Sequence, residues 1–189
     1  EPDDGFFLGV YATESREFIL VSAGNNAQSE YYTIPASDPT ASPTLFSARE
    51  TDLIYTPTHW NGRWHVLTNA GGAEDFKVVT CMPGATARAH WRDFIPHEAG
   101  RYILSLSATK DYLTRLERAN ALPRIVVRHR SGEEHAITIG EEAFLLELAQ
   151  GYEYDTANQR YTYESPTTPP WRRASSSRLR RRNSIWSQR

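Results

Sequence analysis

The sequence has few of the features that mark exported, disulfide-stabilised or membrane-spanning proteins. Cys81 is the only cysteine among 189 residues, so an internal disulfide is impossible. No stretch approaches the ~20 consecutive apolar residues that a membrane helix needs, and no apolar export signal opens the sequence. These absences predict a soluble protein without a membrane partner, and we expect it in the cytoplasm.

Motifs of common catalytic and cofactor sites are also missing. The sequence contains no G-x-S-x-G nucleophile elbow, no H-E-x-x-H, no C-x-x-C and no P-loop. Gly71-Gly72 follows a strand-like run, and a turn explains this pair better than a phosphate cradle does. We therefore expect no cofactor, and we assign no catalytic, cofactor-binding or metal-binding residue.

Histidine is the residue type most able to form a metal site here, but its spacing does not favour one. No pair has the i, i+4 spacing of helical ligands, and no motif ties a carboxylate to a histidine. His59 and His65 flank the turn Asn61-Gly62 and could face each other across a hairpin, with cross-strand packing favoured over metal binding. The full set is His59, His65, His90, His97, His129 and His135.

What the sequence does contain is a repeat of short strand-like runs separated by turn residues. First strands open near Phe6, Ile54 and Tyr102, which are 48 and 48 residues apart. Second strands open 46 and 48 residues apart, near Phe18, Trp64 and Tyr112. A period of about 40–50 residues with four strands per unit is typical of propeller blades. The sequence thus predicts an all-β partial β-propeller of about three and a half four-stranded antiparallel blades.

Two other structural interpretations stay open at this point. A β-sandwich with loosely similar strand lengths would show much of the same pattern. Glu141–Ala149 has helical propensity, but its place one period after Tyr102 favours the first strand of a fourth blade, starting at Phe144 with a partner at Arg160–Glu164. We also expect three and a half blades, which do not close a propeller, to leave two open faces, and this predicts a chain that is marginally stable, aggregation-prone or oligomeric.

Aromatic and acidic side chains also have two possible roles each. Aromatics recur at strand positions, where packing between blades is favoured over sugar binding or base stacking. The acidic doublets lie beside turns, and we expect them to be solvated rather than to form a general acid/base pair. These doublets are Asp3-Asp4, Glu133-Glu134 and Glu141-Glu142, and the aromatics are Tyr11, Tyr32, Tyr55, Trp60, Trp64, Phe76, Trp91, Tyr102 and Tyr112.

The net charge of −2 conceals two unlike segments. Residues 171–189 hold seven arginines and no acid, which leaves 14 basic and 23 acidic side chains, a formal charge of −9, for residues 1–170. We therefore expect a propeller region at 1–170 and a disordered basic tail at 171–189. The tail carries two R-R-x-S patterns that basophilic kinases read, and its arginines could bind nucleic acid or anionic lipid.

Four phrases, in order, resemble the propeller of the prolyl oligopeptidase family, and oligopeptidase B most closely. The first is Ser29-Glu30 after the run FILVSAG, and the second is Leu67-Thr68-Asn69 followed by Gly72-Ala73 and Phe76-Lys77. The third and fourth are Trp91–His97 and Tyr161–Pro169. Together they span residues 5–169. After Pro169 the sequence departs from the family pattern, which favours a disrupted end produced by frame change, truncation or a chimeric junction.

The resemblance implies a definite setting for the chain. Such proteins combine a seven-bladed propeller, which limits access to short peptides, with an α/β-hydrolase domain that holds a Ser-His-Asp triad. The oligopeptidase B branch cleaves after Arg and Lys. The triad and the acidic groups that receive basic side chains lie chiefly in the hydrolase domain, and no residue here matches them. The implied function is a non-catalytic propeller portion of a serine endopeptidase, inactive alone, with the hydrolase domain as its partner.

Two functions of other classes remain as alternatives. A free-standing interaction module could present propeller loops to a protein or nucleic acid, with the Arg-rich tail adding electrostatic attraction, although nucleic acid is not the partner we expect. Glycan binding or hydrolysis on a propeller ranks last, because the sequence offers no convincing carboxylate pair.

Overall fold

The fold was obtained as a computed structural model, which describes residues 4–137, 145–149, 151, 153–165 and 174–178. These residues form four antiparallel sheets, each built from strands that follow one another in the chain. Three of the sheets have four strands and the last has three. We refer to them as blades I to IV in chain order.

Each blade is a meander in which the chain runs from one edge strand to the other. Blade I contains β1 (Phe7–Ala12), β2 (Phe18–Gly24), β3 (Ser29–Pro35) and β4 (Thr44–Ser47). Blade II contains β5 (Tyr55–Trp60), β6 (Arg63–Thr68), β7 (Lys77–Cys81) and β8 (Arg92–Ile95), with a short 3₁₀ helix, η1 (Arg88–His90), before β8.

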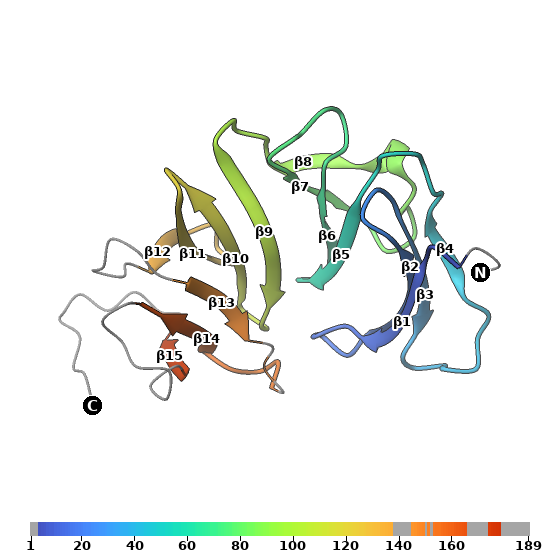
Figure 1. Cartoon of the computed structure of the whole chain (residues 1–189). Coiled ribbons are helices and arrows are strands. Elements are labelled where there is room, and N and C mark those ends of the chain that lie inside the picture. The colour runs from blue at the N-terminus through green and yellow to red at the C-terminus, as the bar shows by residue number, and fades with distance from the viewer. Residues whose placement is uncertain (1–3, 138–144, 150, 152, 166–173, 179–189) are drawn as a thin grey trace.

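The second half of the chain repeats the arrangement. Blade III contains β9 (Arg101–Ala108), β10 (Tyr112–Ala119), β11 (Leu122–His129) and β12 (Glu134–Ile137). Blade IV contains β13 (Leu145–Ala149), β14 (Asn158–Glu164) and β15 (Ala174–Arg178). The blades follow one another along an arc, with the first strands β1, β5, β9 and β13 nearest its centre (Figure 1).

This architecture confirms the predicted all-β partial propeller and excludes the sandwich. Separate sheets placed side by side around an arc differ from two sheets packed face to face. Leu145–Ala149 is a strand, as its position in the repeat predicted, and Glu141–Phe144 lie outside the described residues. The short outer strands β4 and β8 were not predicted, because each has only four residues and pairs with its neighbour through a register shift.

Tight hairpin turns set the register within the blades. Asn61 and Gly62 both have positive φ, 51° and 70°, as the two central residues of a turn that matches strand twist. Gly71 and Gly72, at 73° and 77°, form the predicted turn between β6 and β7. A side chain at these glycines would be strained whatever space surrounds it.

The core of the molecule lies between blades, as expected for sheets that cannot bury both faces alone. Aromatic rings from blades I and II meet in one cluster, where Tyr55 contacts Tyr31, Phe46 and Trp91. Blades III and IV share a second cluster that includes Tyr112, Leu116 and Tyr161. Most of the aromatics in the repeat therefore pack between blades, which confirms the favoured interpretation of their role.

The outward face of blade I contrasts with these buried interfaces. Leu8 and Val10 are 65% and 69% exposed, and they point away from blade II. Such an apolar face resembles the blade surfaces that are covered elsewhere in the chain. Self-association through it stays a prediction.

Part of the arginine-rich segment joins the fold. Ala174–Arg178 pair with β14 as the third strand of blade IV, within the segment for which the sequence predicted a disordered tail. The remaining residues of 171–189 lie outside the described residues. The boundary between residues 170 and 171 therefore stays a prediction.

Candidate functional site

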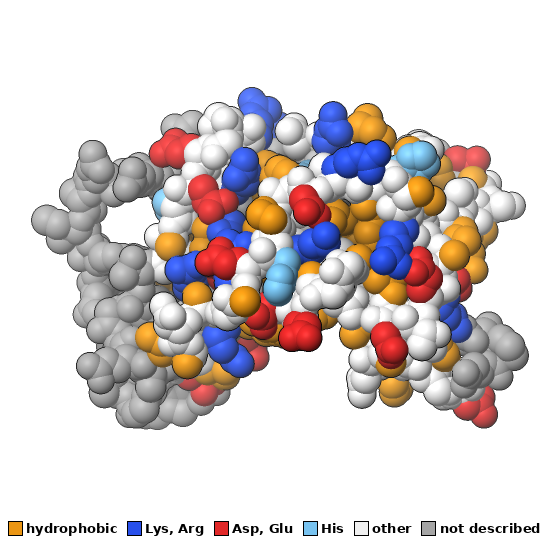
Figure 2. Space-filling model, turned by 90° about the horizontal axis from the view of Figure 1, so that it is seen from above, with side chains coloured by type: hydrophobic (Ala, Val, Ile, Leu, Met, Phe, Trp, Pro, Cys, Tyr) orange, Lys and Arg blue, Asp and Glu red, His pale blue; other side chains and the backbone are white. Residues whose placement is uncertain are grey.

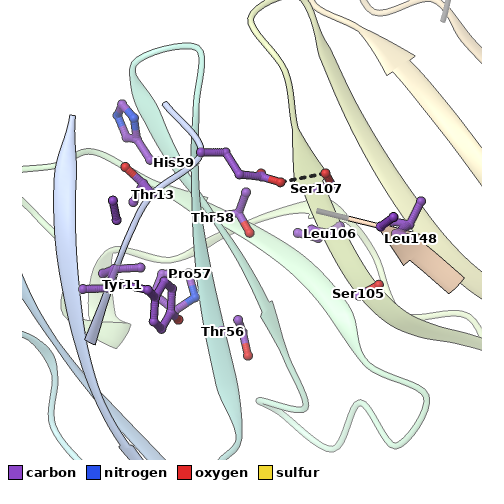
Figure 3. Close-up of a pocket in the computed structure, with 14 residues that line it drawn as sticks. Tyr11, Thr13, Thr56, Pro57, Thr58, His59, Ser105, Leu106, Ser107 and Leu148 are labelled. Atoms are coloured by element: carbon purple, nitrogen blue, oxygen red, sulfur yellow. Dashed lines mark hydrogen bonds between the residues drawn. The ribbon is translucent and has the colours of Figure 1, made fainter. Parts of the chain in front are cut away.

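The inner strands of all four blades line one cavity near the centre of the arc. Its volume is about 230 Å³. Figure 3 shows its walls, to which β1 contributes Tyr11, β5 contributes Thr56 and Thr58, β9 contributes Ser105 and Ser107, and β13 contributes Leu148. Hydroxyl and aliphatic groups thus form most of this wall. Such groups suit the binding of a polypeptide better than its cleavage.

Glu14 projects into this region from the turn between β1 and β2. Its Oε1 atom lies 2.7 Å from Ser107 Oγ on β9 (Figure 3), and the Ala108 N–H donates a hydrogen bond to Oε2. Burial raises the pKa of Glu14 above its usual range, and the hydrogen bonds from Ser107 and Ala108 act in the opposite direction. A carboxyl group of blade I is therefore held against blade III.

A second cavity of about 230 Å³ lies beside the first and shares Glu14 and Ser107 with it. Blade IV supplies Gln159 to its wall, and Gln159 Oε1 lies 3.5 Å from Ser107 Oγ. Glu153, Tyr154 and Arg160 complete the titratable groups of this cavity. Glu14 thus lies between the two cavities.

His59 lies close to a serine and an acid, but this group is not a catalytic triad. The ring is 2% exposed, and its Nδ1 atom lies 2.9 Å from Ser15 Oγ and 3.6 Å from Glu17 Oε1. A triad needs serine and acid on opposite ring nitrogens, so that one orients the base for the other. Burial also lowers the pKa of His59. The arrangement therefore fixes the turn rather than activating Ser15.

His65 does not face His59, contrary to what the hairpin allowed. His59 pairs with Trp64 and His65 with Thr58, which places the two rings on opposite faces of blade II. His65 packs between Trp60 and Phe94, and burial lowers its pKa to about 4. Packing explains both rings, as favoured from the sequence.

The remaining histidines are spread over two blades. His90 and His97 belong to blade II, and His129 and His135 to blade III. Within the described ranges, no group of three or more His, Cys, Asp or Glu side chains is placed to hold a metal ion. The sequence assignment of no metal, cofactor or catalytic residue remains a prediction.

One acidic doublet departs from expectation. Glu134 was expected to be solvated, but Arg115 Nη1 and Nη2 donate to its carboxylate at 2.7 and 2.8 Å. Arg115 Nε also donates to Glu117, which is 0% exposed and receives Arg124 Nε as well, each at 2.5 Å. The carboxylates of Glu117 and Glu134 are therefore paired with arginines, and this network links neighbouring strands of blade III. Asp3, Glu141 and Glu142 lie outside the described residues.

Sequence reasoning missed Glu14 and Glu117. Glu14 was visible only as part of a turn cluster, Thr13-Glu14-Ser15, and nothing local indicates that it reaches a strand 93 residues away. Glu117 sits two residues after Arg115 in a strand, so both point to one face. That spacing could have indicated an ion pair, although not its burial.

The comparisons with known proteins agree on one family. The family model described as "Prolyl oligopeptidase, N-terminal beta-propeller domain" matches residues 1–172. Dipeptidyl aminopeptidase BI of Pseudoxanthomonas mexicana is 32% identical over 169 residues, which cover 89% of this chain and 23% of that protein. Protease 2 of Moraxella lacunata is 28% identical over 170 residues, which cover 89% of this chain and 24% of that protein.

Solved structures show the same fold at lower identity. Oligopeptidase B from Trypanosoma brucei with covalently bound antipain has a TM-score of 0.85 and 18% identity, covering 95% of this chain and 26% of that one. Oligopeptidase B from Leishmania major has a TM-score of 0.82 and 19% identity, and the match covers 95% of this chain and 28% of that one. The chain spans about a quarter of the length of these relatives. Among the described residues, no helix is long and apolar enough to cross a membrane.

Proposed function

Because this chain belongs to the prolyl oligopeptidase family, as part of its N-terminal β-propeller domain, we propose that it forms a non-catalytic channel wall of an oligopeptidase-B-like serine endopeptidase. The observation that carries the proposal is the convergence of β1, β5, β9 and β13 on one cavity whose wall holds no activated nucleophile among the described residues. A wall of this kind acts sterically, by limiting what reaches a triad located elsewhere.

The partner in this proposal is an α/β-hydrolase domain that supplies nucleophile, base and oxyanion hole. Residues 1–170 would act as the propeller portion, and 171–189 as a separate basic segment, with the family match ending at residue 172. A cytoplasmic setting belongs to the same proposal, supported by the single cysteine.

Short peptides with basic side chains are the proposed substrates of the complete enzyme. Acidic groups beside the cavities support this choice, since Glu153 lines the second cavity and Glu17 lies 3.6 Å from His59 at the wall of the first. Nucleic acid is a weaker candidate, because acidic and basic side chains are interspersed over the face in Figure 2 rather than gathered by sign.

The test compares the pure chain with a mixture of the chain and an intact hydrolase domain from the same source. The substrates are a short arginine-containing peptide and the same cleavage sequence placed within a folded protein. We expect no hydrolysis by the pure chain, and in the mixture a higher ratio of short-peptide to folded-protein cleavage than the hydrolase domain shows alone.

The matched control replaces the chain with a Trp64→Ala variant, in which the packing of blades I and II is impaired. This variant should leave the selectivity of the hydrolase domain unchanged. Hydrolysis by the pure chain, or a wild-type chain that does not alter selectivity, would contradict the proposal.

A further inference from the structure

The turn between β1 and β2 connects blade I to each of the other blades. Ser15 Oγ reaches His59 Nδ1 of blade II at 2.9 Å, and Glu14 Oε1 reaches Ser107 Oγ of blade III at 2.7 Å. Ser107 Oγ in turn lies 3.5 Å from Gln159 Oε1 of blade IV. Contacts over 93 and 52 residues of sequence thus meet at one hydroxyl group.

The orientation of the Gln159 amide is set by its surroundings. Its Nε2 group donates to the Ala149 carbonyl at 3.3 Å and to the Arg160 carbonyl at 3.0 Å. Both amide protons are therefore in use, and Oε1 must be the atom that faces Ser107. Gln159 and Ser107 are both buried, so neither can turn to solvent for another partner.

The number of protons available along the Glu14–Ser107–Gln159 contacts bears on the protonation state of Glu14. Ser107 Oγ has one proton and lies beside two acceptor oxygens, on Glu14 and on Gln159. If Glu14 is ionised, the hydroxyl can satisfy only one of them. If Glu14 is protonated, its O–H donates to Ser107 Oγ, Ser107 donates to Gln159 Oε1, and Oε2 still accepts from the Ala108 N–H. The neutral acid thus gives each of the three side chains a partner within the clasp.

We propose that Glu14, Ser107 and Gln159 form a clasp that holds blade I against blades III and IV and separates the two channel-side cavities, and that the clasp is closed when Glu14 is a neutral carboxylic acid. Loss of the proton leaves a partly buried carboxylate and a Gln159 carbonyl without a donor from Ser107. The clasp then opens, and the two cavities that share Glu14 and Ser107 merge.

The direction of the pH effect follows from burial. A folded-state pKa above the usual glutamate value means that the clasp contributes most at low pH, and loses its contribution as the pH rises through the pKa of Glu14. The titratable groups facing Glu14 across the two cavities and the turn are Tyr11, Glu17, His59, Glu153, Tyr154 and Arg160.

The amide of Ala108 gives a direct readout of the clasp. Thr109 and Tyr112 exchange both backbone hydrogen bonds, so the N–H of Ala108 points away from β10 and toward Glu14. Its hydrogen-exchange rate, corrected for the intrinsic effect of pH, should therefore rise when the clasp opens.

The experiment measures Glu14 by its side-chain ¹³C chemical shift and Ala108 by amide exchange, both in the full chain and over a range of pH. We expect Glu14 to titrate above the usual glutamate value, near 4.3, with Ala108 exchange accelerating over the same interval. The exposed Glu74 provides an internal comparison in the same spectra.

Two substitutions separate the effect of Glu14 protonation from the effect of removing its side chain. Glu14→Gln keeps a donor for Ser107 and an acceptor for Ala108, so protection of Ala108 should persist and become independent of pH. Glu14→Ala should accelerate Ala108 exchange by about tenfold over the wild type at low pH, where the clasp is closed, as loss of one hydrogen bond implies. The two rates should converge as the pH rises and the wild-type clasp opens. The proposal is overturned if Glu14 titrates at or below the usual value, or if Glu14→Gln exposes Ala108 as much as Glu14→Ala does. If either variant fails to fold, the wild-type titration alone decides.

Discussion

The interface between blades I and II and the interface between blades II and III solve the same packing problem with different chemistry. The first is built from aromatic rings, with Trp64 against Phe46 at 5.3 Å between centroids. On the second, blade III presents the buried pair Arg115–Glu117 beside its apolar residues, and Arg128 lies over the ring of Phe94. Both interfaces are closed, and the buried Arg115–Glu117 pair lies on the second.

The difference indicates which interface responds to which perturbation. Apolar burial stabilises in proportion to area and is insensitive to pH. Buried charges give little net stability as a set, yet removal of one member leaves another uncompensated. The contact between blades I and II should therefore be most sensitive to loss of apolar surface, while the second interface should be sensitive to single charge substitutions and, through His65, to pH.

The largest effect is expected from Trp64→Ala, which removes a fully buried ring at the centre of the first interface. Loss of such a side chain costs about 3–5 kcal/mol of unfolding free energy through lost burial and a residual cavity. Denaturant-induced unfolding measures it. Trp64→Phe should recover part of the loss, and a change below about 1 kcal/mol in the alanine variant would show that the ring is not packed as described.

Acidification should act next most strongly, through His65. With its folded-state pKa lowered to about 4, the ring contributes stability that is complete above its usual pKa of about 6.5 and is lost as the pH falls toward 4. The effect is on the order of 3 kcal/mol for a shift of this size. Unfolding free energy should be compared between wild type and His65→Phe over this range, and the variant should show a flatter profile. Parallel profiles would rule out a buried neutral His65.

Glu117→Gln should destabilise the chain by about 2–3 kcal/mol, because Arg115 then keeps only Glu134 as a charged partner. Replacing both members, as in Arg115→Leu with Glu117→Leu, should recover most of that loss, since an apolar pair needs no compensation. The double-mutant cycle built from Arg115→Leu, Glu117→Leu and the double variant measures the coupling directly. A double variant as unstable as the sum of its singles would mean that the pair is not coupled.

The smallest effect is expected at the surface pair of Lys110 and Asp155, which lie 2.7 Å apart across blades III and IV. Both side chains are exposed, so solvent and salt screen their attraction. Lys110→Ala should leave the unfolding midpoint unchanged within error. A clear shift of the midpoint would show that exposed charges contribute to holding the blades together.

Much of the fold could be predicted because the repeat is periodic and local. Strands such as Arg63–Thr68 and Tyr112–Ala119 alternate or concentrate apolar residues between turn signals, and their spacing identified blades. The four-residue strands β4 and β8 are too short to show that pattern, since only two residues of β4 and one of β8 are buried. The strand at Ala174–Arg178 was also not predicted, because backbone pairing with β14 needs no apolar sequence.

The candidate site was less predictable, because its contacts are long-range. Glu14 looks like a turn residue until β1 and β9 are placed on the same arc, and His59 and His65 look like a pair until the register assigns them to opposite faces. Single-sequence spacing reports neighbours along a strand. It carries no information on which blades converge at the centre.

The most direct test of the account is reaction of the purified chain with a fluorophosphonate that labels activated serines, followed by assay on an arginine-containing peptide. We expect neither labelling nor hydrolysis, because Ser15 and Ser107 are held in structural hydrogen bonds and neither has a base and an acid on opposite nitrogens of a histidine. Labelling of a single serine, together with peptide hydrolysis that its alanine substitution abolishes, would contradict the assignment of this chain as a non-catalytic propeller wall.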